Sequence, residues 1–82
     1  MSNTPHQLQQ EFPDQVEALH ALKLSDAHFA KAVDRYNDVN HQIHLAETNV
    51  EPAEDLAIIE MRKERMALKD QIAAALRAAA AA

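Results

Sequence analysis

The chain of 82 residues contains no glycine and no cysteine. Without glycine it lacks the glycine-rich loops that hold phosphate groups, because those loops need backbone conformations that other residues resist. Without cysteine it has no disulfide framework and no cysteine-based zinc site, which fits a reducing compartment. These two absences exclude the glycine-rich nucleotide-binding motifs and the disulfide-rich class of small proteins.

Long apolar runs and an excess of positive charge are also missing. No stretch approaches the roughly 20 apolar residues of a membrane span, and the N-terminus lacks the basic start and apolar core of a signal peptide. The 8 basic and 13 acidic residues give a net charge of -5, which is the wrong sign for binding nucleic acid or an anionic membrane through charge. We expect a cytoplasmic protein with no membrane partner and no reliance on nucleic acid.

Helix-forming residues make up most of what is present, so the predicted fold class is all-α. The 3 prolines each indicate a helix start, because proline is tolerated in the first helical turn and disfavoured further in. Thr4 and Gln7 flank Pro5 in the pattern of a capping box, which predicts a short helix beginning at Pro5. Phe12-Pro13 interrupts it, so we expect one or two short helices within residues 5–23.

The first long helix is predicted over residues 26–49, with Ser25 as its N-cap and Leu24 packing on Phe29 as a hydrophobic staple. Apolar residues then recur at steps of three and four, which is typical of a helix-pairing seam. The seam residues are Phe29, Val33, Tyr36, Val39 and Ile43. Asn40 beside this seam is the kind of polar residue that fixes the register of paired helices.

The second long helix is predicted over residues 53–78, after a break at Pro52. Its seam residues are Ile58, Met61, Leu68, Ile72 and Leu76, and Leu56, Ile59 and Met66 broaden its apolar face. The alanines at 79–82 have no large side chains to hold them, so we expect a frayed tail.

A short connection between two long helices of similar length predicts an antiparallel, coiled-coil-like hairpin within a single domain, 1–82. Each apolar stripe is broader than one seam, so some apolar surface is left over. Either the N-terminal segment folds back through Phe12, Val16, Leu19 and Leu22, or a second copy covers that surface, and the two are compatible. We therefore expect completion by self-association into a dimer or tetramer.

Arg65 lies between Met61 and Leu68 and points partly into the seam. Its aliphatic stem can pack while its charged end escapes. We expect it to pair across the hairpin with an acidic residue and so to help set register. The candidate partners are Asp34, Asp38 and Glu47.

Several motifs along the chain form a recognisable set. They are Phe12-Pro13, Ser25-Asp26-Ala27-His28-Phe29, Asp34, Tyr36, Ile43-His44, Glu47 and Leu68-Lys69-Asp70-Gln71-Ile72. Together these motifs resemble the YdcH-like family of short bacterial proteins of unknown function, and the resemblance extends from Leu8 to Leu76. It implies an all-helical, coiled-coil-like fold in a bacterial cytosol and no reaction. The family supplies no catalytic residues to carry over, and the alanine-rich end, 73–82, departs from its pattern.

A thin hairpin offers no pocket that could shift the pKa values of an acid and a base apart, so we predict no enzyme activity and no cofactor. His41, His44 and Glu47 are spaced three apart near one helix face and are weak metal candidates. A zinc site needs at least three ligands on a fixed scaffold, so we predict no metal site.

The leading hypothesis is a helical interaction and oligomerisation module, serving as a small adaptor or regulator for itself or an unidentified protein partner. The alternative is a nucleic-acid-associated accessory protein that uses the basic cluster Arg62, Lys63, Arg65 and Lys69. Acidic residues interrupt that cluster, which favours a solvated face of ion pairs. A third hypothesis is a metal-responsive protein that uses the His41, His44 and Glu47 set.

Overall fold

The computed structural model describes residues 4–48 and 54–81, and within these ranges every regular element is a helix. The elements in chain order are α1 (Leu8–Glu11), the 3-10 helix η1 (Pro13–Gln15), α2 (Val16–Ser25), α3 (Ala27–Glu47) and α4 (Asp55–Ala81). The predicted all-α fold, with short N-terminal helices before two long packed helices, is therefore confirmed.

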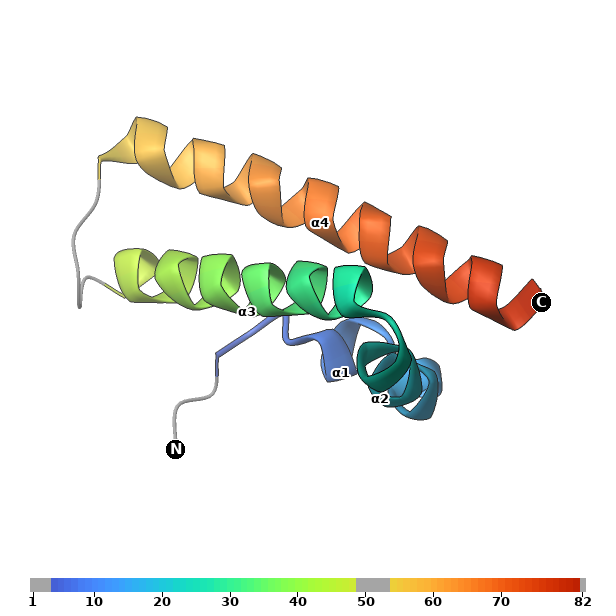
Figure 1. The fold of residues 1–82 in the computed structure, drawn as a ribbon. Helices are drawn as coiled ribbons and strands as arrows, with labels where there is room; N and C mark the ends of the chain where they lie inside the picture. The colour runs from blue at the N-terminus through green and yellow to red at the C-terminus, as the bar shows by residue number, and fades with distance from the viewer. Residues whose placement is uncertain (1–3, 49–53, 82) are drawn as a thin grey trace.

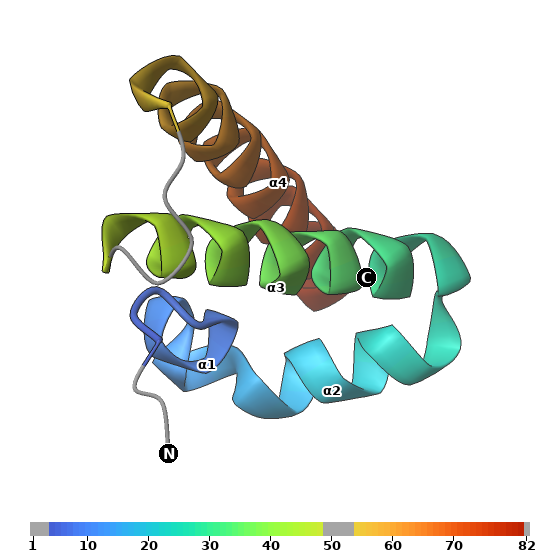
Figure 2. The same ribbon diagram turned by 90° about the vertical axis from the view of Figure 1, so that its left-hand side faces the viewer.

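Helix α3 is the middle layer, with α4 on one side and the N-terminal helices on the other (Figure 1). Near the connection Glu47 contacts Arg62 at 2.9 Å, and at the far end Gln71 lies 3.4 Å from His28. As residue numbers fall along α3 they rise along α4, so the two long helices are antiparallel. Figure 2 shows that they cross obliquely.

The position of α3 explains why its apolar stripe is broad. Its buried residues are Phe29, Ala32, Val33, Tyr36, Val39, Asn40, Ile43 and Ala46. Phe29 and Tyr36 join Ile72 and Leu76 of α4 in one core cluster, and Val33 joins Leu8 and Leu19 from the N-terminal side in the same cluster. Full burial of a large apolar side chain contributes about 1.5–3 kcal/mol, so this cluster holds three layers together.

The seam between α3 and α4 is unevenly packed. All five predicted seam residues of α3 are buried, as are Ile72 and Leu76 of α4, whereas Ile58, Met61 and Leu68 are only half-buried. The helices diverge toward their connection in Figure 1, which accounts for the weaker burial of Ile58 and Met61. The tight end of the hairpin is the end farthest from the connection.

The N-terminal segment folds back onto its own chain, which is the first of the two predicted ways to cover leftover apolar surface. Leu19 is buried, and Phe12 and Leu22 pack against the core cluster. Val16, expected to join them, is 42% exposed. The second way, association with another copy, stays a prediction.

The start of α3 differs from the sequence-based prediction. Its N-cap is Asp26, whose Oδ1 accepts hydrogen bonds from the backbone N–H groups of His28 at 3.0 Å and Phe29 at 3.1 Å. Ser25 is instead the last residue of α2. Aspartate caps as well as serine and adds a negative charge at the positive end of the helix. The predicted Ser25 cap is wrong by one residue, and the staple is wrong too, because Leu24 is exposed.

The predicted capping box at Thr4 is also wrong. Helix α1 begins at Leu8 rather than Pro5, and its N-cap Gln7 makes no side-chain capping bond. His6 has a φ of 61°, in the left-handed region, so the backbone cannot enter a right-handed helix there. The backbone carbonyls of Pro5 and His6 bond to side chains of α3 instead.

Helix α4 continues through Ala81, past the predicted end at Ala78, although we expected the tail to fray. Alanine has the highest helix propensity of all residues, so the run can extend a helix without packing. Residue 82 and the predicted start of this helix at residue 53 lie outside the described ranges.

Candidate functional site

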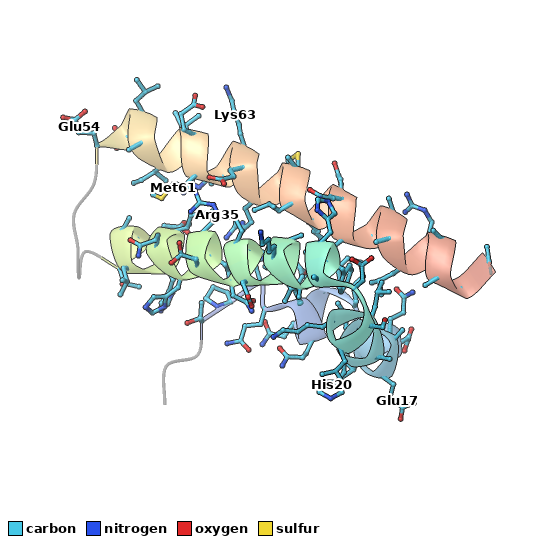
Figure 3. The ribbon with its side chains drawn as sticks, in the orientation of Figure 1. Glu17, His20, Arg35, Glu54, Met61 and Lys63 are labelled. Carbon is cyan, nitrogen blue, oxygen red and sulfur yellow. The ribbon has the colours of Figure 1, made fainter. Side chains whose placement is uncertain are left out.

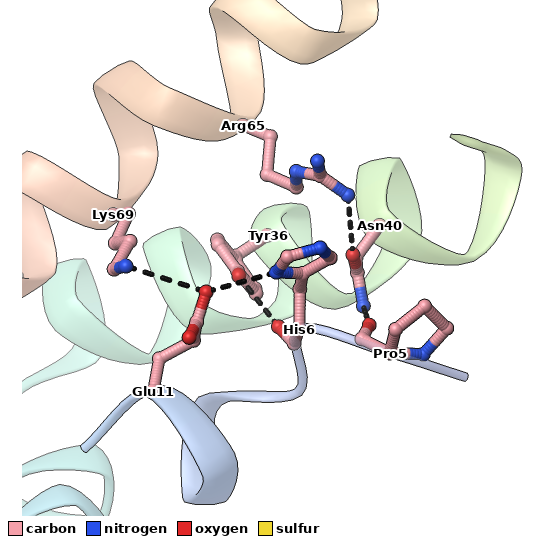
Figure 4. A network of polar contacts seen from close by, with 7 residues as sticks. All are labelled: Pro5, His6, Glu11, Tyr36, Asn40, Arg65 and Lys69. Atoms are coloured by element: carbon pink, nitrogen blue, oxygen red, sulfur yellow. Dashed lines mark hydrogen bonds and ion pairs between the residues drawn. The ribbon is translucent and has the colours of Figure 1, made fainter. Parts of the chain in front are cut away.

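A short segment with a turn at Pro5 and His6, residues 4–7, which we call the strap, lies against α3 and is held there by two buried polar side chains. Tyr36 donates from its hydroxyl to the carbonyl oxygen of His6 at 2.6 Å, and Asn40 Nδ2 donates to the carbonyl oxygen of Pro5 at 2.8 Å (Figure 4). Tyr36 is fully buried and Asn40 is 3% exposed. Buried donors need partners, so the strap supplies the acceptors that allow these residues to lie inside.

Helix α4 joins the same network. Arg65 Nη1 donates to Asn40 Oδ1 at 3.0 Å, and Lys69 Nζ lies 3.3 Å from Glu11 Oε1. Glu11 also lies 3.2 Å from Nδ1 of His6. We call this set the polar clamp, and its members are Pro5, His6, Glu11, Tyr36, Asn40, Arg65 and Lys69 (Figure 4). The clamp ties the strap, α1, α3 and α4 to one another.

Charge within the clamp is arranged to keep Glu11 ionised. Burial raises the pKa of Glu11, but the hydrogen bonds from His6 and Lys69 and the positive charge of Lys69 outweigh burial, so the net pKa is lowered. Burial raises the pKa of Tyr36, the negative charge of Glu11 adds to this, and Arg65 opposes it. The clamp therefore holds an ionised carboxylate next to a phenol that stays neutral.

Two ion pairs on the surface also connect the long helices. Arg35 binds Glu64 through two parallel contacts, Nε to Oε2 at 2.6 Å and Nη2 to Oε1 at 2.9 Å. This hydrogen bonding raises the pKa of Arg35 and lowers the pKa of Glu64. Arg62 contacts Glu47 at 2.9 Å. Because these side chains are exposed, solvent screens the pairs and each adds little stability.

The predicted acidic partners of Arg65 are all bound elsewhere. Asp34 lies 3.8 Å from Lys23, Asp38 lies 3.3 Å from Arg35, and Glu47 lies 2.9 Å from Arg62. The proposed pairing of Arg65 with one of them is wrong. Its partner is Asn40, the other residue selected as a register candidate, and a register role for the two stays a prediction.

The side chains of the basic cluster that supported the nucleic-acid alternative all make contacts within the chain. Arg62 contacts Glu47, and Lys63 lies 3.7 Å from Glu60. Arg65 donates to Asn40 and Lys69 to Glu11. A phosphate backbone would have to compete with these contacts as well as with a net charge of -5. The geometry lends no support to that alternative.

The histidine-based metal candidates do not form a cluster. Within residues 4–48 and 54–81, no group of three or more histidine or acidic side chains is arranged to hold a metal ion. His41 and Glu47 are exposed and His44 is half-buried, and Glu47 is already bonded to Arg62. His41, His44 and Glu47 therefore do not come together as metal ligands in this structure.

A hollow of about 190 Å³ lies between α2 and α3. Its lining residues are Leu8, Gln9, Val16, Leu19, His20, Lys23, Val33 and Asn37. No carboxylate lines it, and its titratable side chains are His20 and Lys23, so it lacks a pair of carboxyl groups that could act as general acid and general base.

The outer face of α4, defined here as Leu56, Ile59, Lys63 and Met66, points away from the core. These residues are spaced by three, four and three, so they lie along one side of the helix. Leu56 and Met66 are each 67% exposed and Ile59 is 45% exposed. Figure 3 shows Lys63 pointing away from α3 while Met61 points toward it. Large apolar side chains thus line a surface that residues 4–48 and the rest of 54–81 leave uncovered.

Sequence reasoning identified the broad apolar face of α4, the seam and both register candidates, but it missed the strap, Glu11 and the Arg35–Glu64 pair. Every residue has a backbone carbonyl, so the residue types at Pro5 and His6 could not indicate that their carbonyl oxygens accept hydrogen bonds from α3. Glu11 and Lys69 are far apart in sequence, and opposite charges alone do not select partners at that distance.

Comparison with known families and proteins places the chain beside one family description. A family model described as "Protein of unknown function (DUF465)" matches residues 29–76. No curated protein and no solved structure matches the chain. Neither α4 nor any shorter helix in the described part of the chain has the length and hydropathy of a membrane span.

Proposed function

The chain belongs to the DUF465 family, the YdcH-like family of small helical proteins of unknown function, and from this premise we propose that it is a non-catalytic helical interaction module. The predicted family resemblance is confirmed. In this proposal the protein acts as a small adaptor or regulator that binds another helix along the outer face of α4. A cytoplasmic location stays a prediction.

One observation carries the proposal, namely the exposure of Leu56, Ile59 and Met66 on a single side of α4. Helices dock on one another through apolar residues at this spacing. Covering a large apolar side chain contributes about 1.5–3 kcal/mol when burial is complete, so these three side chains supply a driving force for association. Their exposure in the free chain is otherwise unfavourable.

The rest of the molecule supports such a role by holding α4 in place. Ile72 and Leu76 anchor one half of the helix in the core, and Arg65 and Lys69 connect it to the polar clamp. None of these contacts uses the outer face. A partner helix can therefore bind without disrupting these contacts. Because α4 is already ordered in the free chain, binding carries no further entropy cost for folding this helix.

Site-specific photocrosslinking in living cells tests the proposal. An unnatural photoreactive amino acid is placed at Met66, which is exposed on the outer face. The matched control position is His20, which is exposed on α2 and lies on the opposite side of α3 from α4 (Figure 3). We expect a discrete crosslinked product at Met66 that is absent at His20 and that disappears when Ile59→Lys is added.

Mass spectrometry then identifies the protein joined to Met66. A single partner, whether another protein or a second copy of this chain, supports the proposed function. Equal crosslinking at Met66 and His20, or no product at Met66, rejects it. Circular dichroism of each purified variant checks that the helices are intact.

A further inference from the structure

We propose, resting on the proposed function, that the helix covering the outer face of α4 is α4 of a second copy of this chain, lying antiparallel to the first. The inference names the partner of that face and its direction. It rests on the way apolar and charged residues are distributed along one helix.

The apolar residues of the outer face complement themselves when the helix is reversed. An antiparallel arrangement centred near Met61 places Leu56 opposite Met66 of the other copy, and it does so twice by symmetry. The same arrangement places Ile59 opposite Lys63, whose aliphatic stem can cover it. Leu56 and Met66 are each 67% exposed in the single chain. In the antiparallel pair, Leu56 of one copy and Met66 of the other would cover each other.

Charge favours the antiparallel direction over the parallel one. Glu60 and Lys63 are both exposed and contact each other within one chain at 3.7 Å. A parallel pair would bring Lys63 beside Lys63 and Glu60 beside Glu60, whereas the antiparallel pair brings Glu60 of one copy beside Lys63 of the other. Like charges that face each other across an interface are unfavourable.

The distribution of charge along α4 also favours the antiparallel direction. Glu54 and Asp55 lie at the start of α4 and its basic residues lie further along. Reversing the second copy sets the acidic start of one helix toward the basic middle of the other and opposes the two helix dipoles. The apolar and charged residues of the outer face are therefore complementary to those of a reversed copy of the same helix, and this is why we name a second copy as the partner.

Disulfide pairing between two single-cysteine variants tests the direction directly. Leu56→Cys and Met66→Cys proteins, one of them carrying a mass tag, are mixed in equal amounts in a glutathione redox buffer. Each variant has one thiol because the natural chain has none. We expect the mixed disulfide to exceed each symmetrical disulfide by about tenfold, because exchange at equilibrium favours thiols that the fold holds together.

His20→Cys is the control for random collisions, since it lies on α2 away from the proposed contact. Symmetrical disulfides in excess would show a parallel pair and overturn the inference. Disulfides no more abundant than those of the His20→Cys control would also overturn it. Circular dichroism of the reduced proteins confirms that each variant folds.

Sedimentation equilibrium of the unmodified chain gives an independent measurement. We expect a dimer whose dissociation constant rises by at least about tenfold in Ile59→Lys, because the new charge lies beside Lys63 of the other copy. Glu17→Lys on α2 is the control and leaves the dissociation constant unchanged. A natural chain that stays monomeric at every concentration overturns the inference.

The two proposals fail in distinguishable ways. If Met66 crosslinks to a different protein in cells and the mixed disulfide does not form, the second-copy inference falls and the proposed function stands. If Met66 crosslinks to nothing and the chain is monomeric, both fall.

Discussion

Asn40 and Arg65 are hydrogen-bonded across the two long helices, with Oδ1 of Asn40 accepting from Nη1 of Arg65 at 3.0 Å. The same amide donates from Nδ2 to the carbonyl oxygen of Pro5 at 2.8 Å. One buried side chain therefore connects three segments, namely the strap, α3 and α4. Because a buried amide with a missing partner is costly, each of its two bonds depends on the correct placement of a different segment.

The strength of this link can be measured by a double-mutant cycle with Asn40→Ala and Arg65→Met. The methionine keeps much of the arginine stem and removes the guanidinium group, with both its donors and its positive charge. We expect a coupling free energy of unfolding of about 0.5–1.5 kcal/mol from urea denaturation. Additive effects of the two substitutions would mean that the hydrogen bond contributes nothing to stability.

The register role of Arg65 is a separate prediction. In Arg65→Leu the amide of Asn40 loses a partner while the seam gains apolar surface, so we expect the helices to persist with a changed or mixed assembly state, seen by sedimentation and by added lines in NMR spectra. Arg65→Leu with higher stability and an unchanged assembly state would remove the register role.

Tyr36→Phe removes the hydroxyl that holds the strap at His6 and keeps the ring in the core. We expect a loss of about 1 kcal/mol in the free energy of unfolding. Faster amide exchange should be confined to the peptide covering residues 4–11, because only the strap loses a bond. Gln9→Ala, on the exposed side of α1, is the matched control. Unchanged exchange in the strap would contradict its attachment through Tyr36.

Asp26→Ala and Ser25→Ala distinguish the observed cap of α3 from the one expected from sequence. Loss of the Asp26 carboxylate leaves the backbone N–H groups of His28 and Phe29 without their acceptor, so we expect about 1 kcal/mol of destabilisation. Ser25→Ala should have little effect on the thermal midpoint. The reverse order in thermal denaturation would restore Ser25 as the cap.

Glu11 predicts a dependence of stability on pH. Its folded-state pKa is lowered from the ordinary value of 4.5, so its charged form stabilises the fold above that value, and the contribution is lost as pH falls through the lowered pKa. Compared with Glu11→Gln, the natural chain should be more stable by on the order of 1 kcal/mol at neutral pH. The difference should shrink toward zero in acid.

Urea denaturation of both proteins across this range measures that difference. The Arg35–Glu64 pair lowers the pKa of Glu64 as well, but it is present in both proteins and cancels in the comparison. A stability difference that stays constant from neutral pH into acid would show that the charge of Glu11 does not act through the clamp.

Much of the fold is readable from the sequence because apolar spacing and proline positions are local signals. The seam of α3, from Phe29 to Ile43, is buried as its spacing predicts, and so are Ile72 and Leu76. Local signals also misled where two neighbouring residues compete for one role. Ser25 and Asp26 are both good caps, and the choice between them depends on where α2 ends.

The remaining features depend on contacts between distant residues. Spacing along α4 shows that Ile58 and Met61 face α3, but it does not show that the helices diverge there. Arg65 bonds to Asn40 and not to one of the three carboxylates, because the crossing of the helices brings the amide within reach. The sequence of either helix alone does not determine how the two helices cross. The leftover apolar surface was evident from the width of the stripes, and the structure assigns part of it to the outer face.

The strap is held through its main chain, and this has a consequence for how the protein can evolve. Tyr36 and Asn40 bond to carbonyl oxygens, which every amino acid carries, so the two bonds are indifferent to the side chains at positions 5 and 6. Mutations there can accumulate while the attachment persists, provided that the residue at position 6 tolerates the left-handed backbone of His6. Relatives whose N-terminal sequences have diverged beyond recognition could then keep the same attachment through the matching pair of donors on α3.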